Sequence, residues 1–179
     1  MVAVGNLGNT LKGIYKSTNS GANWSKISSG LPASFQGYIK FDQVRTTPNT
    51  IAASIGVSSS STTELFRSTD LGSTWSGQTG SGHAQWQYWF AHDVAMNPSD
   101  LNSLVYAGVN AYRHTWAGSR ITLSSTIHDD VHDIQFDPSN TNICYIACDG
   151  GVYRSANITA ATPTWSQRNN GLGATQFYA

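Results

Sequence analysis

The chain has 179 residues, with ten basic and ten acidic side chains and no formal net charge. This balance excludes a strongly basic nucleic-acid binder and a highly acidic solvating protein, and no run of like charges is long enough for a binding tail. No stretch approaches the roughly 18 apolar residues of a membrane helix, so we expect no membrane insertion. The 39% of apolar residues can build one modest core.

The composition favours strands over helices. Ser, Thr, Asn and Gly together account for 71 of the 179 residues, whereas Glu occurs once and Lys four times. Ser, Thr and Asn compete with helical backbone for hydrogen bonds, and β-branched and aromatic residues suit a pleated sheet. We therefore predict an all-β protein that is rich in turns.

Three segments repeat one pattern of strand, turn and tryptophan. They are GIYKSTNSGANW at 13–24, ELFRSTDLGSTW at 64–75 and GVYRSANITAATPTW at 151–165. Their tryptophans are 51 and 90 positions apart, which predicts an intermediate unit near Trp116. A period of about 40 to 50 residues is typical of propeller blades.

A second pattern precedes the first in each unit and is aligned on a proline. Val44, Val94 and Ile134 each stand four residues before Pro48, Pro98 and Pro138, within segments that alternate with period two. These segments predict a first strand that ends in a turn. The apolar runs IAAS, LVYAG and ICYIAC predict the second strand. The repeated segments predict the third strand, and the residues after each tryptophan predict the fourth.

Four short antiparallel strands per unit make a propeller blade. We predict a propeller with about four blades in one domain that spans 1–179. The expected units are 1–36, 37–80, 84–126 and 127–170, and a further strand is expected to begin within 171–179.

The two ends predict an open arrangement. The chain opens on VAV, which resembles a second strand, and closes on TQFYA, which resembles the first strand of another blade. Either this last strand completes the first blade and closes a four-bladed ring, or the chain is part of a larger propeller. We expect the second arrangement, whose unpaired sheet faces invite self-association.

Ser68, Asp70, Gly72 and Trp75 follow the pattern S-x-D-x-G-x-x-W, which resembles the Asp box of the bacterial neuraminidase repeat propellers. The other two turns match in part, through Ser17, Asn19, Gly21 and Trp24 in the first and Ser155, Asn157 and Trp165 in the last. The proline-aligned strand and the closing RNNGLGATQFYA resemble the branch of xyloglucanase-type hydrolases and sortilin-like domains. This resemblance implies a propeller fold, and it covers enzymes, receptors and assembly factors alike.

The chemistry of the box predicts a structural role. A serine hydroxyl and an Asp or Asn side chain can bond backbone groups in a tight turn, glycine supplies positive φ, and the indole buries a large area. We therefore expect Asp70 to stabilise its turn and to take no part in catalysis.

The densest polar run is HDDVHD at 128–133. If it is extended, His128, Asp130 and His132 share one face and could hold a divalent metal or move a proton. The alternative is a polar loop at the rim of the propeller. Because the spacing fits no standard zinc pattern, we expect no metal and no other cofactor.

Two His-Asp pairs occupy one register of the repeat. His92-Asp93 stands where His132-Asp133 stands in the next unit, which favours an architectural position repeated with the blade. All four residues are also candidates for ligand binding at the rim.

Asp149 is the candidate catalytic residue. It precedes a Gly-Gly-aromatic-Arg type segment in ACDGGVYR, and the resemblance to xyloglucanase-type enzymes implies that such an aspartate is a catalytic carboxylate. Glycosidases need two carboxyl groups, and the sequence identifies one of them. The alternative is a plain turn role.

The segment HAQWQYWFAHD at 83–93 is predicted as a strand, with Trp86, Tyr88 and Phe90 on one face and Trp89 on the other. These rings could stack on sugars or pack between blades, and Trp86 is the best exposed candidate.

The function expected is that of a secreted, carbohydrate-associated propeller, similar to xyloglucanase-type glycoside hydrolases, with a polysaccharide partner. The alternative is a non-enzymatic propeller that binds other proteins or builds a structure.

Cys144 and Cys148 would lie about 13 Å apart on a strand, too far for a disulfide to each other.

Overall fold

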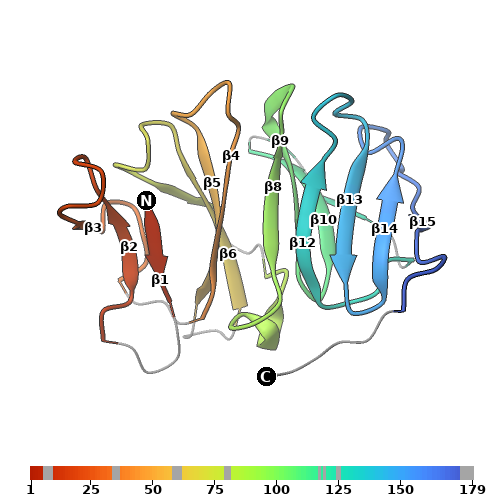
Figure 1. Ribbon diagram of the computed structural model, residues 1–179, viewed down its shortest axis with the longest axis horizontal. Coiled ribbons are helices and arrows are strands. Elements are labelled where there is room, and N and C mark those ends of the chain that lie inside the picture. Colours follow the sequence, from red (N-terminus) through yellow and green to blue (C-terminus); the bar gives the residue numbers. More distant parts are fainter. Residues whose placement is uncertain are drawn as a thin grey trace.

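Four antiparallel sheets stand side by side in an open array, as Figure 1 shows for the computed structural model. The structure describes residues 1–5, 10–33, 37–57, 62–78, 82–116, 118, 120–123 and 126–173. The first sheet contains β1 (Val2–Val4), β2 (Gly13–Lys16) and β3 (Ser25–Ile27), and the second contains β4 (Ile39–Gln43), β5 (Ile51–Val57), β6 (Thr62–Ser68) and β7 (Ser76–Gln78). The third contains β8 (Asp93–Asn97), β9 (Asp100–Ala107), β10 (Ala111–Thr115) and β11 (Ile121–Thr122), and the fourth contains β12 (Val131–Phe136), β13 (Cys144–Cys148), β14 (Gly151–Ser155) and β15 (Ser166–Gln167).

Each sheet is a meander in which consecutive strands pair antiparallel. The prediction of an all-β protein built from propeller blades is confirmed, although the first sheet has three strands in the part that the structure describes. The helical structure among the described residues is a single 3-10 turn, η1 (Gln85–Gln87). None of the described helical structure is long and apolar enough to span a membrane.

The first strands of neighbouring sheets lie next to each other. β8 contacts β4 on one side and β12 on the other, and β1 contacts β4. The sheets therefore pack face against face, with the first and fourth at the two ends of the array (Figure 1).

Three apolar cores fill the three spaces between the sheets. Ile51 and Ala53 of β5 pack with Ile14 of the first sheet, whereas Ala52, between them in sequence, packs with Leu104 of the third sheet. The third core joins the third and fourth sheets. Because successive side chains of a strand point to opposite faces, a strand of an inner sheet can be buried at successive positions and not only at every second one. All seven residues of β5 are buried.

The turn after β6 is closed by the side chains of Ser68 and Asp70. Ser68 Oγ donates to Asp70 Oδ1 at 2.8 Å and accepts the N–H of Gly72 at 2.8 Å. Asp70 accepts the N–H groups of Ser73 and Thr74 at 3.0 and 2.9 Å and the Thr74 hydroxyl at 2.7 Å. These bonds, led by the Thr74 N–H, lower the pKa of Asp70 to about 2.

The two related turns use asparagine in the same way. Ser17 Oγ accepts the N–H of Gly21 at 2.8 Å, and Asn19 Oδ1 accepts the N–H of Asn23 at 2.9 Å. In the longer last turn, Asn157 Oδ1 accepts the N–H of Thr164 at 2.9 Å. An amide oxygen therefore replaces the carboxylate oxygen without loss of the turn.

One predicted strand is placed differently. The alternation around Val44 predicts a strand there, but β4 ends at Gln43 because the N–H of Thr47 bonds back to the Val44 carbonyl at 2.9 Å and closes a turn. Val44 is nevertheless buried between the second and third sheets.

The predicted closing strand TQFYA lies outside the described residues. Cys144 and Cys148 both lie in β13 with free thiols, as their spacing predicts.

Replacing Trp75 by Ala is expected to lower the free energy of unfolding by about 3 to 5 kcal/mol, because the indole is 5% exposed and fills the core between the first and second sheets. Trp24→Ala is the matched control, since Trp24 stands at the same place in its turn but is 45% exposed. Its expected cost in dilute solution is about 0.5 kcal/mol or less. Urea denaturation of both variants checks this, and equal costs would contradict the assignment of Trp75 to the core.

Candidate functional site

His132 and Asp149 form a contact at the start of β12. The pairing of β12 with β13 shifts between Val131 and Asp133, so His132 lies in a bulge. Its Nε2 is 2.8 Å from Asp149 Oδ1, and the two side chains are 32% and 22% exposed. Bulges re-aim a side chain relative to the regular strand. The fold thus brings together two candidate residues that are 17 positions apart, at a point that solvent can reach.

Asp149 is held by the tight turn between β13 and β14, which explains the two glycines that follow it. A Cβ on Gly150 would lie 2.5 Å from the Cβ of His128, and Gly151 has φ +101° and faces Asn169. Asn169 Nδ2 donates to the Gly150 carbonyl at 2.8 Å. Nothing in the repeat pattern of the sequence marks Asn169 as the partner of this turn.

Asp130 is the second carboxyl group in this region. Partial burial and the nearby charge of Asp149 raise its pKa, in that order of size. The condition under which His128, Asp130 and His132 would share one face, an extended run, is not met, because β12 begins at Val131 and Asp130 has φ +59°. Among the residues that the structure describes, no three His, Cys, Asp or Glu side chains are placed to hold a metal ion.

The aromatic segment before β8 is a compact turn and not the predicted strand. The N–H of Gln87 bonds to the Ala84 carbonyl at 2.8 Å, and the N–H of Phe90 to the Gln87 carbonyl at 2.8 Å. Consecutive bonds of this type use the backbone groups that a sheet would need. They leave Trp86 and Trp89 65% and 45% exposed.

Trp89, Phe90, His132 and Asp149 form a continuous line, which we call the aromatic–acidic row. The rings of Trp89 and Phe90 are 5.3 Å apart, and the ring of His132 meets that of Phe90 edge-on at 5.1 Å. The contact of His132 with Asp149 completes the line. A cavity of about 180 Å³ beside Trp89 is also lined by Gly5, Gly37 and Tyr38. The aromatic segment and Asp149, which are far apart in the sequence, therefore lie together at one end of the blades.

His92 supports this row from the interior. Its Nδ1 is 2.7 Å from Ser54 Oγ, which is also 2.7 Å from His83 Nε2, and its own Nε2 is 3.1 Å from the Tyr88 carbonyl. Ser54, His83 and His92 have no exposed surface. Burial lowers the pKa of His92 to about 4, so the imidazole is neutral at pH 7. His92 thus ties down the turn that carries Trp89 and offers no surface to a ligand.

Asp93 is also interior. It is 7% exposed, and its Oδ2 accepts the N–H of Ile134 from the next blade at 2.8 Å. Burial raises its pKa to about 7. Asp133, at the same register, is exposed. The two His-Asp pairs therefore differ in surroundings, because the fourth sheet covers β8 whereas no sheet in the described part of the chain covers the far side of β12.

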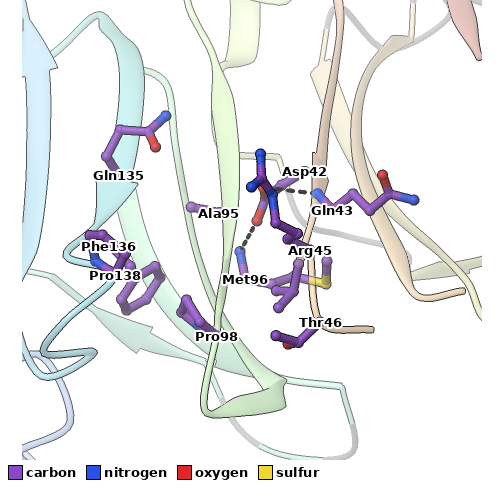
Figure 2. A pocket seen from close by; sticks show the side chains of 11 residues that line it. Asp42, Gln43, Arg45, Thr46, Ala95, Met96, Pro98, Gln135, Phe136 and Pro138 are labelled. Carbon is purple, nitrogen blue, oxygen red and sulfur yellow. Dashed lines mark hydrogen bonds between the residues drawn. The ribbon is translucent and has the colours of Figure 1, made fainter. Parts of the chain in front are cut away.

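A second hollow lies at the other end of the first strands, where β4, β8 and β12 run into their proline turns (Figure 2). Its volume is about 280 Å³, and its lining includes Arg45, Pro98 and Phe136. Asp42 accepts the N–H of Met96 there at 2.6 Å. Phe136 is four residues beyond His132, about 13 Å along a strand, so this hollow is separate from the row. It contains none of the predicted site residues.

No family model and no curated protein sequence matches the chain. Solved structures do: an ancestral GH74 enzyme is similar with a TM-score of 0.61 and 19% identity, over 87% of this chain and 21% of its own. The GH74 enzyme of Niastella koreensis has a TM-score of 0.50 and 20% identity, over 71% of this chain and 17% of its own. The chain thus spans about a fifth of the length of these enzymes. At this identity the likeness shows the fold, which is that of GH74-type propeller blades.

Asp93→Asn is expected to change the pH dependence of stability. The carboxyl group has a pKa of about 7 in the folded chain and an ordinary pKa of 3.8, so the stability that it contributes is full below pH 3.8 and is lost as the pH rises through 7. Asparagine does not titrate. The variant should therefore gain stability relative to the original chain between pH 4 and 7, by up to about 1.4 kcal/mol per pKa unit. Urea denaturation at several pH values measures the difference, and a difference that is constant with pH contradicts the burial of the charge.

Proposed function

We propose that the chain binds a polysaccharide along the aromatic–acidic row. The observation that carries the proposal is the continuity of the row, in which an exposed indole, a second ring and a histidine lead to Asp149. Aromatic faces stack on the apolar faces of sugar rings, and carboxylates and imidazoles bond sugar hydroxyls. A surface that combines rings, an imidazole and a carboxylate suits a polymer of sugar units.

Trp86 and Trp89 are the stacking residues in this proposal. They stand three positions apart in a segment with i to i+3 bonding, a spacing at which side chains lie one above the other. Each indole is at least 45% exposed. Large apolar side chains that are grouped on a surface are typical of a binding site. Repeated sugar units of one polymer could meet both rings.

Asp149 and Asp130 extend the proposal to cleavage of the glycosidic bond. Hydrolysis needs one carboxyl group that keeps a proton and one that is ionised. The raised pKa of Asp130 suits the acid. Asp149, which contacts His132, is the other carboxyl group in this proposal. The likeness in fold to GH74 enzymes supports this reaction class, and the chain spans only part of their length.

Two further features belong to the proposal. The turns at Ser17, Ser68 and Ser155 are Asp boxes, which is supported by a bond that all three share, from the backbone N–H two residues on to the serine Oγ. The chain acts outside the cell, where polysaccharides of this kind are met.

Trp89→Ala is expected to weaken retention on native gels that contain xyloglucan by at least about tenfold in dissociation constant, because an exposed stacking residue contributes most of the energy of such a contact. Trp24→Ala is the matched control, since this indole is equally exposed but lies in the turn before β3. Gels that contain dextran in place of xyloglucan test for non-specific binding to polysaccharide. Retention that Trp89→Ala leaves unchanged, or that Trp24→Ala lowers equally, contradicts the proposed surface.

If the chain releases reducing ends from xyloglucan, Asp149→Asn should abolish the release and leave retention on the gel within about twofold. The two substitutions then separate cleavage from binding. Release that persists in Asp149→Asn removes Asp149 from the reaction, and binding without release limits the proposal to recognition.

A further inference from the structure

A bulge in β12 carries the histidine of the aromatic–acidic row. The pairing of β12 with β13 passes from Val131 directly to Asp133, so His132 has no partner residue in the neighbouring strand. The extra residue of a bulge is left out of the ladder, and its backbone groups need other hydrogen-bond partners. The source of those partners decides how firmly His132 is aimed at Asp149.

Lys40 supplies one partner, from the second sheet. Its Nζ donates to the His132 carbonyl at 3.3 Å, across 92 positions of the chain. Lys40 pairs with Ser54 in the register of β4 with β5, so the two side chains leave the same face of the sheet. On that face, Ser54 Oγ is 2.7 Å from His92 Nδ1 of the third unit. Lys40 therefore points toward the third blade, and its long side chain reaches the fourth.

Asp93 holds the other side of the bulge, from the third sheet. Its Oδ2 accepts the N–H of Ile134, two residues beyond His132, at 2.8 Å. Burial raises the pKa of Asp93, and the nearby positive charge of Lys40 opposes this rise. The carbonyl on one side of the bulge and the N–H on the other are thus bound by a cation and an acid, which attract each other when the acid is ionised.

The row depends on the position of the bulge at two points. The imidazole of His132 meets the ring of Phe90 at 5.1 Å and Asp149 Oδ1 at 2.8 Å. A binding group must be held to within about 0.5 Å of its working position by the residues around it. Because His132 has no partner in β13, the contacts with Lys40 and Asp93 take the part that ladder bonds have elsewhere in β12.

We propose that Lys40 is a positioning residue for the aromatic–acidic row. With Asp93 it fixes the bulge that aims His132 at Asp149, and it does not itself touch the bound ligand. This role requires a cation on a long side chain, so arginine can replace lysine and a neutral residue cannot. The importance of Lys40 for polysaccharide rests on the proposed function, but the geometry of the bulge can be measured without any ligand.

Nuclear magnetic resonance of the whole chain tests the geometry. Lys40→Met keeps the length of the side chain and removes its charge. In this variant, the Overhauser contact between the rings of Phe90 and His132 should be lost. The carboxyl group of Asp93 should titrate above pH 7, because its ionised form loses a nearby cation. Lys40→Arg should keep both properties of the original chain, and so should Lys26→Met, the control for one lost charge, since Lys26 is exposed in β3.

The indole of Trp75 distinguishes loss of position from a general loosening of the fold, because it lies in the core between the first and second sheets. Its signals should not move in Lys40→Met. A ring contact that survives in Lys40→Met overturns the proposal, and so do Trp75 signals that move together with the loss of this contact. Circular dichroism shows which variants fold. If Lys40→Met does not fold, Lys40→Gln replaces it, and a chain that folds with neither contradicts a role limited to positioning.

Retention on native gels that contain xyloglucan tests the importance of Lys40 for binding. Lys40→Met should weaken retention by at least about threefold in dissociation constant, and Lys40→Arg by less than about twofold. A lost ring contact with unchanged retention overturns the proposal, because Lys40 then positions the bulge but no binding surface. If the original chain is not retained at all, the proposed function fails, and the ring contact alone decides whether Lys40 holds the bulge.

Discussion

The structure depends on one constraint: a blade of this chain cannot bury its own apolar side chains. Strands of an inner sheet carry apolar residues on both faces, so each sheet must be covered on both sides. All residues of β5 and β8 are buried, whereas β12, at the end of the array, has two buried positions, Val131 and Ile134, and is partly or fully exposed at the others. Burial of apolar area between sheets is therefore the main source of stability, and the polar contacts across each interface set the order and register of the blades.

The same packing creates the candidate site. The bulge in β12 turns His132 toward Asp149, and the compact turn before β8 places Phe90 against that histidine. This compact turn is held by His92, which is buried and neutral and forms a hydrogen bond with the Tyr88 carbonyl. A residue that the sequence marks as a ligand-binding candidate thus acts as a support for the row. The site exists only where two blades meet, so neither blade contains it alone.

Much of the fold could be predicted from periodicity. The spacing of Trp24, Trp75 and Trp165 and the proline alignment gave the number and order of the blades, because turn chemistry and strand alternation are local properties. The aromatic segment was predicted wrongly as a strand, since its alternation of rings is equally compatible with a 3-10 turn and the deciding bonds are backbone bonds. The partnership of Asn169 with the Gly150 carbonyl had no sequence signal, because the two are 19 positions apart and belong to no repeated pattern.

The sequence by itself determined the repeat and most of its strands and turns, because each depends on the side chains of a few neighbouring residues. Tertiary structure alone decided which of the repeated positions face solvent. His92-Asp93 and His132-Asp133 share one register, and only the second pair is accessible, since the fourth sheet and the aromatic turn cover the first. Burial depends on neighbours that are distant in sequence, and for that reason the repeat could identify these positions but could not assign their roles.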